Sequence, residues 1–209
     1  MTAPDNLRLF GRVHLLVRHW IISGMGVLAF LVGSGCATPN VRSSTWDLTP
    51  LSGKQIQWRP APETQAVVFL FLAVECPISN RALPQLSRLE RQLAPSVAFI
   101  WVYPNLSEDE SAIRKHRVAF QLSPEAYRDP ELRLAKSLEV TVTPEAVVLT
   151  PDGRLIYRGR VNDQYAGLGK GRLQPTREDL AEALNGYLSG QPPSGIVTRA
   201  VGCRIEDLP

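Results

Sequence analysis

The sequence predicts an α/β fold in three layers, in which a mixed central sheet carries helices on both faces. Residues 66–74 and 97–103 are apolar without interruption, which is typical of strands covered on both faces. Between them, residues 80–93 place leucines at spacings of three and four, a helical pattern. Strands joined through a helix lie parallel, and a later hairpin adds an antiparallel pair, so the sheet is expected to be mixed.

The composition excludes several classes of protein. The 209 residues are 44% hydrophobic and 21% charged, as in a globular chain and unlike a disordered, collagenous or disulfide-dense one. The net charge is only +3, and the basic residues do not cluster as a phosphate-binding face requires, so we expect no nucleic-acid partner. The three cysteines cannot all pair with one another, so each must be explained by its position.

Residues 1–36 have the layout of a signal peptide or membrane anchor, with arginines before an uncharged apolar stretch. The small residues before Cys36 resemble the lipobox of bacterial lipoproteins, although Gly33 stands where that motif usually has leucine. The resemblance implies that Cys36 is lipidated and becomes the mature N-terminus. Cleavage after Ala37 and an uncleaved anchor are the alternatives, since a span needs about 20 apolar residues. We therefore expect an exported protein, periplasmic or attached to the membrane through Cys36 or the N-terminal segment.

The rest of the chain divides into three parts. Residues 37–45 are polar and are expected to form a linker. Residues 46–190 carry the patterns of the folded domain, and residues 191–209 form a C-terminal tail that opens with Gln-Pro-Pro-Ser-Gly. The tail contains Cys203 and is expected to be either mobile or wrapped over the domain.

Turn, cap and periodicity patterns predict the other elements of the domain. Trp46 and Trp58 lie in short extended runs on either side of a Ser-Gly-Lys turn. Ser107 and Glu110 form a capping-box pattern, which predicts a helix that continues to Phe120. The later elements are expected as a short helix at 132–138, a strand at 146–150, its hairpin partner at 155–161, and an amphipathic helix at 176–188.

Cys76 lies between the first buried strand and the helix that follows it. At a helix N-terminus, unpaired N–H groups and the helix dipole favour the thiolate, and can lower the thiol pKa well below its ordinary value of about 8.5. Pro77 suits the first helical turn because it has no N–H to leave unpaired. Glu75 opposes the thiolate, whereas Arg81 favours it if its side chain folds back. The position predicts a redox nucleophile; the alternative is an inert core cysteine.

These features resemble the thioredoxin-like superfamily, in particular its redoxin branch, which includes alkyl hydroperoxide reductase (AhpC/TSA). The resemblance is carried by the strand and Cys-Pro at 69–77, residues 129–140, Val142-Thr143-Pro144 before a strand, and the turn at 151–153. It implies a thioredoxin-like fold over residues 46–188. It also implies that Pro144 is cis and lies beside Cys76, and that Thr143 offers its backbone to an extended disulfide substrate.

Two positions depart from the patterns of this superfamily. Ser79 stands where thioredoxins carry the second cysteine of Cys-x-x-Cys, and Ala73 stands where peroxiredoxins carry the hydroxyl that orients peroxide. A lone thiolate forms only a mixed disulfide or a sulfenic acid, so a redox cycle needs a second thiol. Cys203 is the candidate, because disulfides persist in exported compartments. It either resolves Cys76 in a cycle or forms a permanent structural disulfide with it.

No metal and no other cofactor is expected. Copper-binding relatives of thioredoxin use Cys-x-x-x-Cys with a histidine, and here Asn80 occupies the second cysteine position. His116 lies among three basic residues and is expected on a solvated helix face. The loop at 162–176 is expected to be an ordinary surface loop; the alternative is that it borders the active face.

The sequence thus predicts an exported thiol-disulfide oxidoreductase or thiol-dependent peroxidase, in which Cys76 attacks and Cys203 resolves. The substrate is expected to be a protein or small thiol, a disulfide or a peroxide. The residues expected to contact it are Pro77, Arg81, Thr143 and Pro144. The alternative is a non-catalytic binding or structural protein of the same shape, with a permanent Cys76–Cys203 disulfide.

Overall fold

The structure is a computed structural model and describes residues 44–123, 125–192, 194–206 and 208. The longer strands are β1 (Trp46–Pro50), β2 (Ile56–Trp58), β3 (Ala66–Phe71), β4 (Val97–Tyr103), β7 (Glu145–Leu149), β8 (Leu155–Gly159) and β9 (Tyr165–Gly167). The two-residue strands are β5 (Tyr127–Arg128), β6 (Val142–Thr143), β10 (Lys170–Gly171), β11 (Ile196–Val197) and β12 (Cys203–Arg204). The helices are α1 (Pro77–Leu93), α2 (Glu110–Ala119), α3 (Arg133–Ser137) and α4 (Asp179–Leu188).

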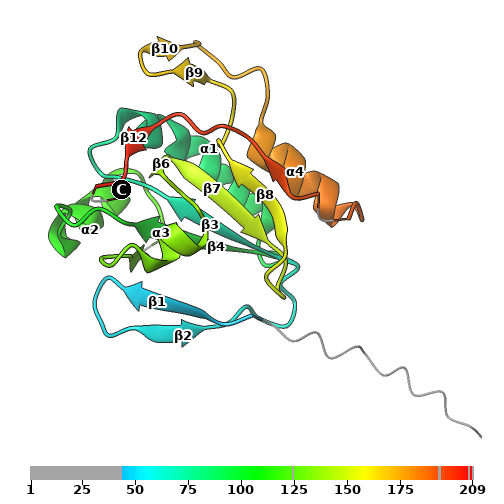
Figure 1. The fold of residues 1–209 in the computed structure, drawn as a ribbon, viewed down its shortest axis with the longest axis horizontal. Coiled ribbons are helices and arrows are strands. Elements are labelled where there is room, and N and C mark those ends of the chain that lie inside the picture. Colours follow the sequence, from blue (N-terminus) through cyan, green and yellow to red (C-terminus); the bar gives the residue numbers. More distant parts are fainter. Residues whose placement is uncertain (1–43, 124, 193, 207, 209) are drawn as a thin grey trace, which may run out of the picture. The chain divides into compact units, whose positions relative to one another are not determined.

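The main sheet has eight strands in the order β11-β8-β7-β3-β4-β5-β1-β2 (Figure 1). β3 lies parallel to β4 and antiparallel to β7, and β8 lies antiparallel to β7 and parallel to β11. The predicted mixed sheet is therefore confirmed. The pairing of β1 with β2 also confirms the expected extended pair around the Ser-Gly-Lys turn.

β3 lies at the centre of the sheet, because all six of its residues are apolar and fully buried. Its alternate side chains serve two cores. Val68 and Leu70 pack in a core with residues of α1 and α4, whereas Val67 and Phe69 pack in a second core with residues of α3. Helices thus cover both faces of the sheet, which confirms the expected three layers. The carboxyl end of β3 leads directly into the segment that carries Cys76.

The start of α2 differs from the expected capping box. Asp109 is the N-cap residue, and its side chain accepts a hydrogen bond from the N–H of Ala112 at 2.7 Å. Ser107 instead donates from its N–H and its hydroxyl to the carboxylate of Glu206, in the C-terminal tail. The prediction that Ser107 caps this helix was wrong, because Asp109, two residues later, accepts the free N–H of the first helical turn.

The C-terminal tail wraps over the domain and adds two short strands to it. β11 pairs in parallel with β8, and β12 pairs antiparallel with β6 (Figure 1). Of the two alternatives for the tail, the structure shows the wrapped one. Among the residues that the structure describes, no helix is both long enough and apolar enough to cross a membrane.

Candidate active site

Cys76 is the N-cap residue of α1 and is only 1% exposed. Its backbone is extended, with φ −84° and ψ 110°, and Pro77 occupies the first helical position as expected. The carbonyl of Cys76 accepts the N–H of Asn80 at 3.0 Å, which closes the first helical turn. The thiol therefore lies at the N-terminus of a long helix, where the aligned peptide dipoles favour negative charge.

The loop before β7 places a backbone carbonyl directly against the Cys76 thiol. The Thr143–Pro144 peptide is cis, which confirms the expectation from the resemblance. The Sγ of Cys76 donates a hydrogen bond to the carbonyl of Thr143, with 3.0 Å between sulfur and oxygen. Thr143 is fully buried, so this contact is shielded from water.

Cys203 also lies against Thr143, through strand pairing. In the antiparallel pairing of β12 with β6, Cys203 lies opposite Thr143 and Arg204 lies opposite Val142. Both Cys76 and Cys203 are free thiols, the first buried and the second half-buried. The tail thus brings a second thiol to the first, across 127 residues of sequence (203 minus 76).

The two thiols differ in acidity. Burial raises the pKa of Cys76, but the nearby Cys203 thiol and the N–H and hydroxyl of Ser79 favour the charged form and outweigh it, so the pKa lies below the ordinary value. For Cys203, burial and then the hydrogen bond to Cys76 and its charge raise the pKa to about 12. Cys203 therefore keeps its proton at neutral pH, and of the two thiols Cys76 loses its proton first.

Ser79 places a hydroxyl where a Cys-x-x-Cys motif has its second thiol. Its side chain is fully buried, and its Oγ has no hydrogen-bond partner among the described residues. It is thus free to donate to the Cys76 thiolate, in agreement with its effect on the pKa of Cys76. A hydroxyl stabilises the thiolate but forms no disulfide, so within this site only Cys203 offers a second sulfur.

The segment before Cys76 is clamped through Val74. The N–H of Val74 donates to the buried carboxylate of Glu108 at 2.8 Å, and its carbonyl accepts from the side chain of Asn80 at 3.0 Å. Burial raises the pKa of Glu108, although its hydrogen bonds from Val74 and Asn105 lower it. Both main-chain groups of the residue two positions before Cys76 are therefore fixed by side chains.

His116 holds the Asn80 side chain, which is one of the two groups that fix Val74. Its Nε2 donates to the Oδ1 of Asn80 at 2.8 Å, since the amide nitrogen of Asn80 is already a donor to Val74. Its Nδ1 then accepts from the hydroxyl of Tyr103 at 3.0 Å. Burial lowers the pKa of His116, with a further contribution from the charge of Arg117, so the neutral ring is favoured.

The expectation of a solvated face for His116 was wrong, because the residue is only 6% exposed. The neighbouring basic residues obscured a pattern in the sequence. Ile113 and His116 are three residues apart and share one buried face of α2. Arg117 is buried as well, over the ring of Trp101.

Arg81 does not fold back toward Cys76. Its guanidinium donates to the carbonyl of Leu173 at 3.3 Å, in the loop that follows the β9–β10 hairpin. It has no place among the groups that lower the pKa of Cys76. The condition under which Arg81 would favour the thiolate is therefore not met, and its contact with a substrate stays a prediction.

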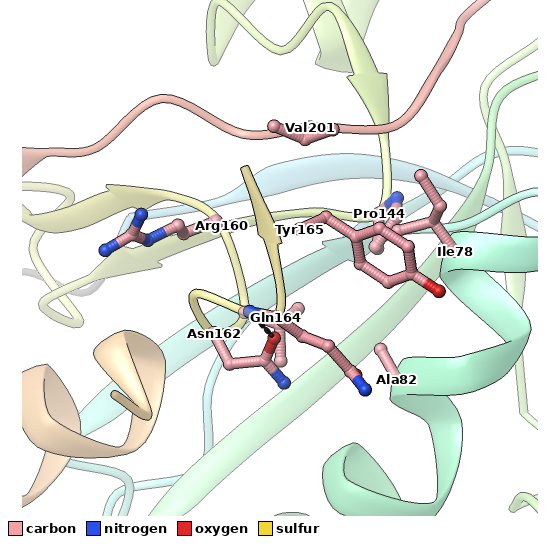
Figure 2. Close-up of a pocket in the computed structure, with 9 residues that line it drawn as sticks. Ile78, Ala82, Pro144, Arg160, Asn162, Gln164, Tyr165 and Val201 are labelled. Carbon is pink, nitrogen blue, oxygen red and sulfur yellow. Dashed lines mark hydrogen bonds between the residues drawn. The ribbon is translucent and has the colours of Figure 1, made fainter. Parts of the chain in front are cut away.

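A small hollow lies beside Pro144, at the first turn of α1. Figure 2 shows Ile78 and Ala82 of α1 facing Tyr165 and Gln164, with Val201 of the tail above them. Its volume is about 20 Å³, room for about one water molecule. The loop at 162–176 therefore contributes to this side of the site, which is the alternative and not the favoured expectation for that loop.

The described residues contain no group of three or more His, Cys, Asp or Glu side chains that could hold a metal ion. Cys36, the predicted lipidation site, lies outside the described residues. The groups that meet in the described site are two thiols, the Ser79 hydroxyl and the Thr143 carbonyl.

No family model and no curated protein matches the sequence. Solved structures do. An uncharacterized conserved protein from Geobacillus kaustophilus has a TM-score of 0.67 and 21% identity, and the match covers 80% of this chain and 90% of that one. A hypothetical protein from Sinorhizobium meliloti 1021 has a TM-score of 0.67 and 18% identity, over 79% of this chain and 92% of that one.

A third similar structure belongs to a named family. It is a thiol:disulfide interchange protein of the thioredoxin family from Chlorobium tepidum TLS, with a TM-score of 0.51 and 13% identity, over 70% of this chain and 94% of that one. The chain therefore has a thioredoxin-like fold. The predicted resemblance to the thioredoxin-like superfamily is confirmed at the level of the fold.

Proposed function

We propose that the protein is a thiol-disulfide oxidoreductase in which Cys76 is the nucleophile and Cys203 the resolving thiol. The observation that carries this proposal is the convergence of both thiols on Thr143: Cys76 through its hydrogen bond to the carbonyl and Cys203 through its strand pairing. The lowered pKa of Cys76 supports its role as the attacking group, because the thiolate is the reactive form.

The exchange takes two steps. The Cys76 thiolate attacks one sulfur of a substrate disulfide, which forms a mixed disulfide and releases the other substrate sulfur as a thiolate that takes a proton from water. Cys203 then gives its proton to water and attacks the Cys76 sulfur. This breaks the mixed disulfide, forms the Cys76–Cys203 disulfide and releases the second substrate sulfur as a thiolate that takes a proton from water. The substrate gains two electrons and the protein loses two. A dithiol reductant returns the protein to its dithiol form and is itself oxidised to a disulfide.

The acidity of Cys203 orders these two steps. Its pKa is raised to about 12, after burial, by the hydrogen bond to Cys76 and by the charge of Cys76. Both effects disappear once Cys76 is bound in a mixed disulfide, so the pKa of Cys203 falls at that point. The resolving thiol therefore becomes more reactive only after the first thiol has reacted.

Thiol-disulfide exchange fits the site better than peroxide reduction. The position that holds the peroxide-orienting hydroxyl in peroxiredoxins is Ala73, which has no hydroxyl and is buried at 3% exposure. Export and attachment to a membrane through Cys36 belong to this proposal and rest on the N-terminal sequence alone. An exported location keeps the Cys76–Cys203 disulfide from being reduced by the cytosolic thiol pool.

The proposal is tested with the reduced full chain and a short peptide that contains one disulfide. One peptide disulfide is expected to be reduced per chain, with a Cys76–Cys203 disulfide as the product in peptide mass mapping. Cys203→Ser should stop at a mixed disulfide on Cys76, and Cys36→Ser is the matched control that should behave as the unaltered chain. An inert Cys76, or a mixed disulfide that never resolves in the unaltered chain, would contradict the proposal. A parallel arm with hydrogen peroxide measures whether Cys76 reacts faster with peroxide.

A further inference from the structure

The C-terminal tail pairs with the backbone of Thr143, whose carbonyl accepts the hydrogen bond from Cys76. We propose that residues 201–206 are a tethered occupant of the groove along β6, and that an extended, cysteine-containing peptide binds there by displacing them. This inference rests on the proposed function and adds to it a competitor for the substrate within the chain. In the structure the tail strand β12 is paired with β6, and Cys76 is only 1% exposed. The inference concerns this closed state.

The pairing of β12 with β6 is the type of contact that an added peptide strand makes. β12 contributes two residues, and β6 has no other strand beside it within the described residues. An extended peptide that adds to a strand edge gains main-chain hydrogen bonds without a specific sequence. A substrate strand with its own cysteine opposite Thr143 would take the position that Cys203 now holds, so the two cannot be present together.

Gly202 shows that the tail fits closely against this groove. A Cβ at this position would lie 2.0 Å from the carbonyl oxygen of Thr143 and 3.1 Å from the nitrogen of Pro144. Both are backbone atoms, which cannot rotate away as a flexible side chain can. Only glycine lets the tail approach the cis-proline loop at this distance.

The tail is attached at two separate places. The first is β11 with Thr198, whose N–H donates to the carbonyl of Arg158 at 2.9 Å and whose hydroxyl lies 2.6 Å from that of Tyr157. The second lies after Cys203, where Ile205 is buried in the α3 core and Glu206 is held by Ser107 and Asn105. If the second attachment opens while the first remains, Cys203 leaves Cys76 but stays tethered nearby.

This arrangement couples resolution to product release. While a substrate strand holds the groove as a mixed disulfide with Cys76, Cys203 lies outside it. When the tail pairs with β6 again, it expels the substrate strand and sets Cys203 beside the sulfur that it attacks. Because the tail is tethered, its return to β6 is an intramolecular event with a high effective concentration.

The test measures how fast iodoacetamide alkylates Cys76 in the reduced full chain, with the modified residue assigned by peptide mapping. Gly202→Ala should open the tail and raise the rate by roughly tenfold, since every 1.4 kcal/mol of easier opening gives that factor. Gly53→Ala is the matched control, because a Cβ at Gly53 meets nothing within 4 Å, and it should leave the rate unchanged. Ser107→Ala removes one holder of Glu206 without touching the groove and should raise the rate by a smaller factor.

An unchanged rate in Gly202→Ala and Ser107→Ala, with both variants folded by circular dichroism, would overturn the inference. Should Gly202→Ala fail to fold, Ser107→Ala decides the question in the same assay. The disulfide state of the unaltered chain is measured alongside after mild oxidation. One mixed result is faster alkylation in the variants together with no Cys76–Cys203 disulfide in the unaltered chain. It would contradict the proposed redox function but support the inference that the tail blocks access to Cys76. A Cys76–Cys203 disulfide together with unchanged alkylation rates would support the redox function and contradict the inference about the tail.

Discussion

Cys76 and Cys203 meet at the same residue, but the chain holds them in different ways. Cys76 follows β3, whose six residues are fully buried, and begins a 17-residue helix. Cys203 lies on a two-residue strand at the edge of a two-stranded sheet, and its neighbour Arg204 is exposed. Cys76, the proposed nucleophile, is part of the core framework, whereas Cys203 lies on a short strand of the C-terminal tail.

This difference suits thiol exchange. A fixed nucleophile keeps the groups that lower its pKa in place, and a detachable partner can yield its position to a substrate. Substitutions that destabilise the β3–α1 framework and the C-terminal tail equally would contradict this difference.

Phe69→Ala in β3 should destabilise the whole domain. Phe69 is completely buried and packs edge-on against Trp46 at 5.5 Å between ring centroids. Loss of a buried phenylalanine costs about 3–5 kcal/mol of unfolding free energy, as measured by denaturant titration. A loss under about 1 kcal/mol would show that β3 is not the framework of the nucleophile.

Ile205→Ala in the tail should cost less, about 1–2 kcal/mol, although Ile205 is only 2% exposed. The reason is that the domain can release the tail locally without unfolding as a whole. The same variant should speed the alkylation of Cys76. A cost equal to that of Phe69→Ala, with no change in alkylation, would mean that the tail and core unfold as one unit.

Ser79→Ala should raise the pKa of Cys76 toward its ordinary value, because it removes one of the donors to the thiolate. The alkylation rate of Cys76 near neutral pH should fall by up to about tenfold, as expected for the loss of a hydrogen bond to a charged group that other donors compensate in part. The pH profile of alkylation measures the shift. Ser87→Ala, farther along α1, serves as the control; an equal shift there would reject the role given to Ser79.

Glu108→Gln should have the smallest effect, on the pH dependence of stability. Burial raises the pKa of Glu108 in the folded protein, so its contribution to stability is present below its unfolded pKa and is lost as pH rises through the folded value. The variant keeps an oxygen for Val74 and should be more stable at neutral pH by less than about 1 kcal/mol. Thermal unfolding at acidic and neutral pH measures it, with exposed Glu63→Gln as the control. A variant less stable at both pH values would contradict this account of Glu108.

The central parts of the fold and site could be predicted because they depend on local patterns. The apolar run of β3, the leucine spacing of α1 and the Cys-Pro dipeptide between them place Cys76 at a helix N-terminus. β4 was predicted with its observed bounds, since seven consecutive apolar residues form it. The cis peptide before Pro144 came from the resemblance and not from periodicity.

The remaining parts could not be predicted because they depend on distant contacts. A strand of two residues such as β12 has no periodicity to detect, and its pairing with β6 joins positions about 60 residues apart. His116 was assigned to a solvated face because charge dominates its neighbours in sequence, whereas its partners Asn80 and Tyr103 come from other elements. Ser107 was assigned to a helix cap, and its actual partner, Glu206, lies in the tail.

The most direct test of the central claim is an equilibrium redox titration of the full chain, with the Cys76–Cys203 disulfide quantified by peptide mapping. We expect a reversible two-electron transition between about −120 and −270 mV, the range of catalytic dithiols, that is lost in Cys203→Ser. A disulfide that stays oxidised below about −300 mV would identify a structural bond. That result, or the absence of any Cys76–Cys203 disulfide, would contradict the account.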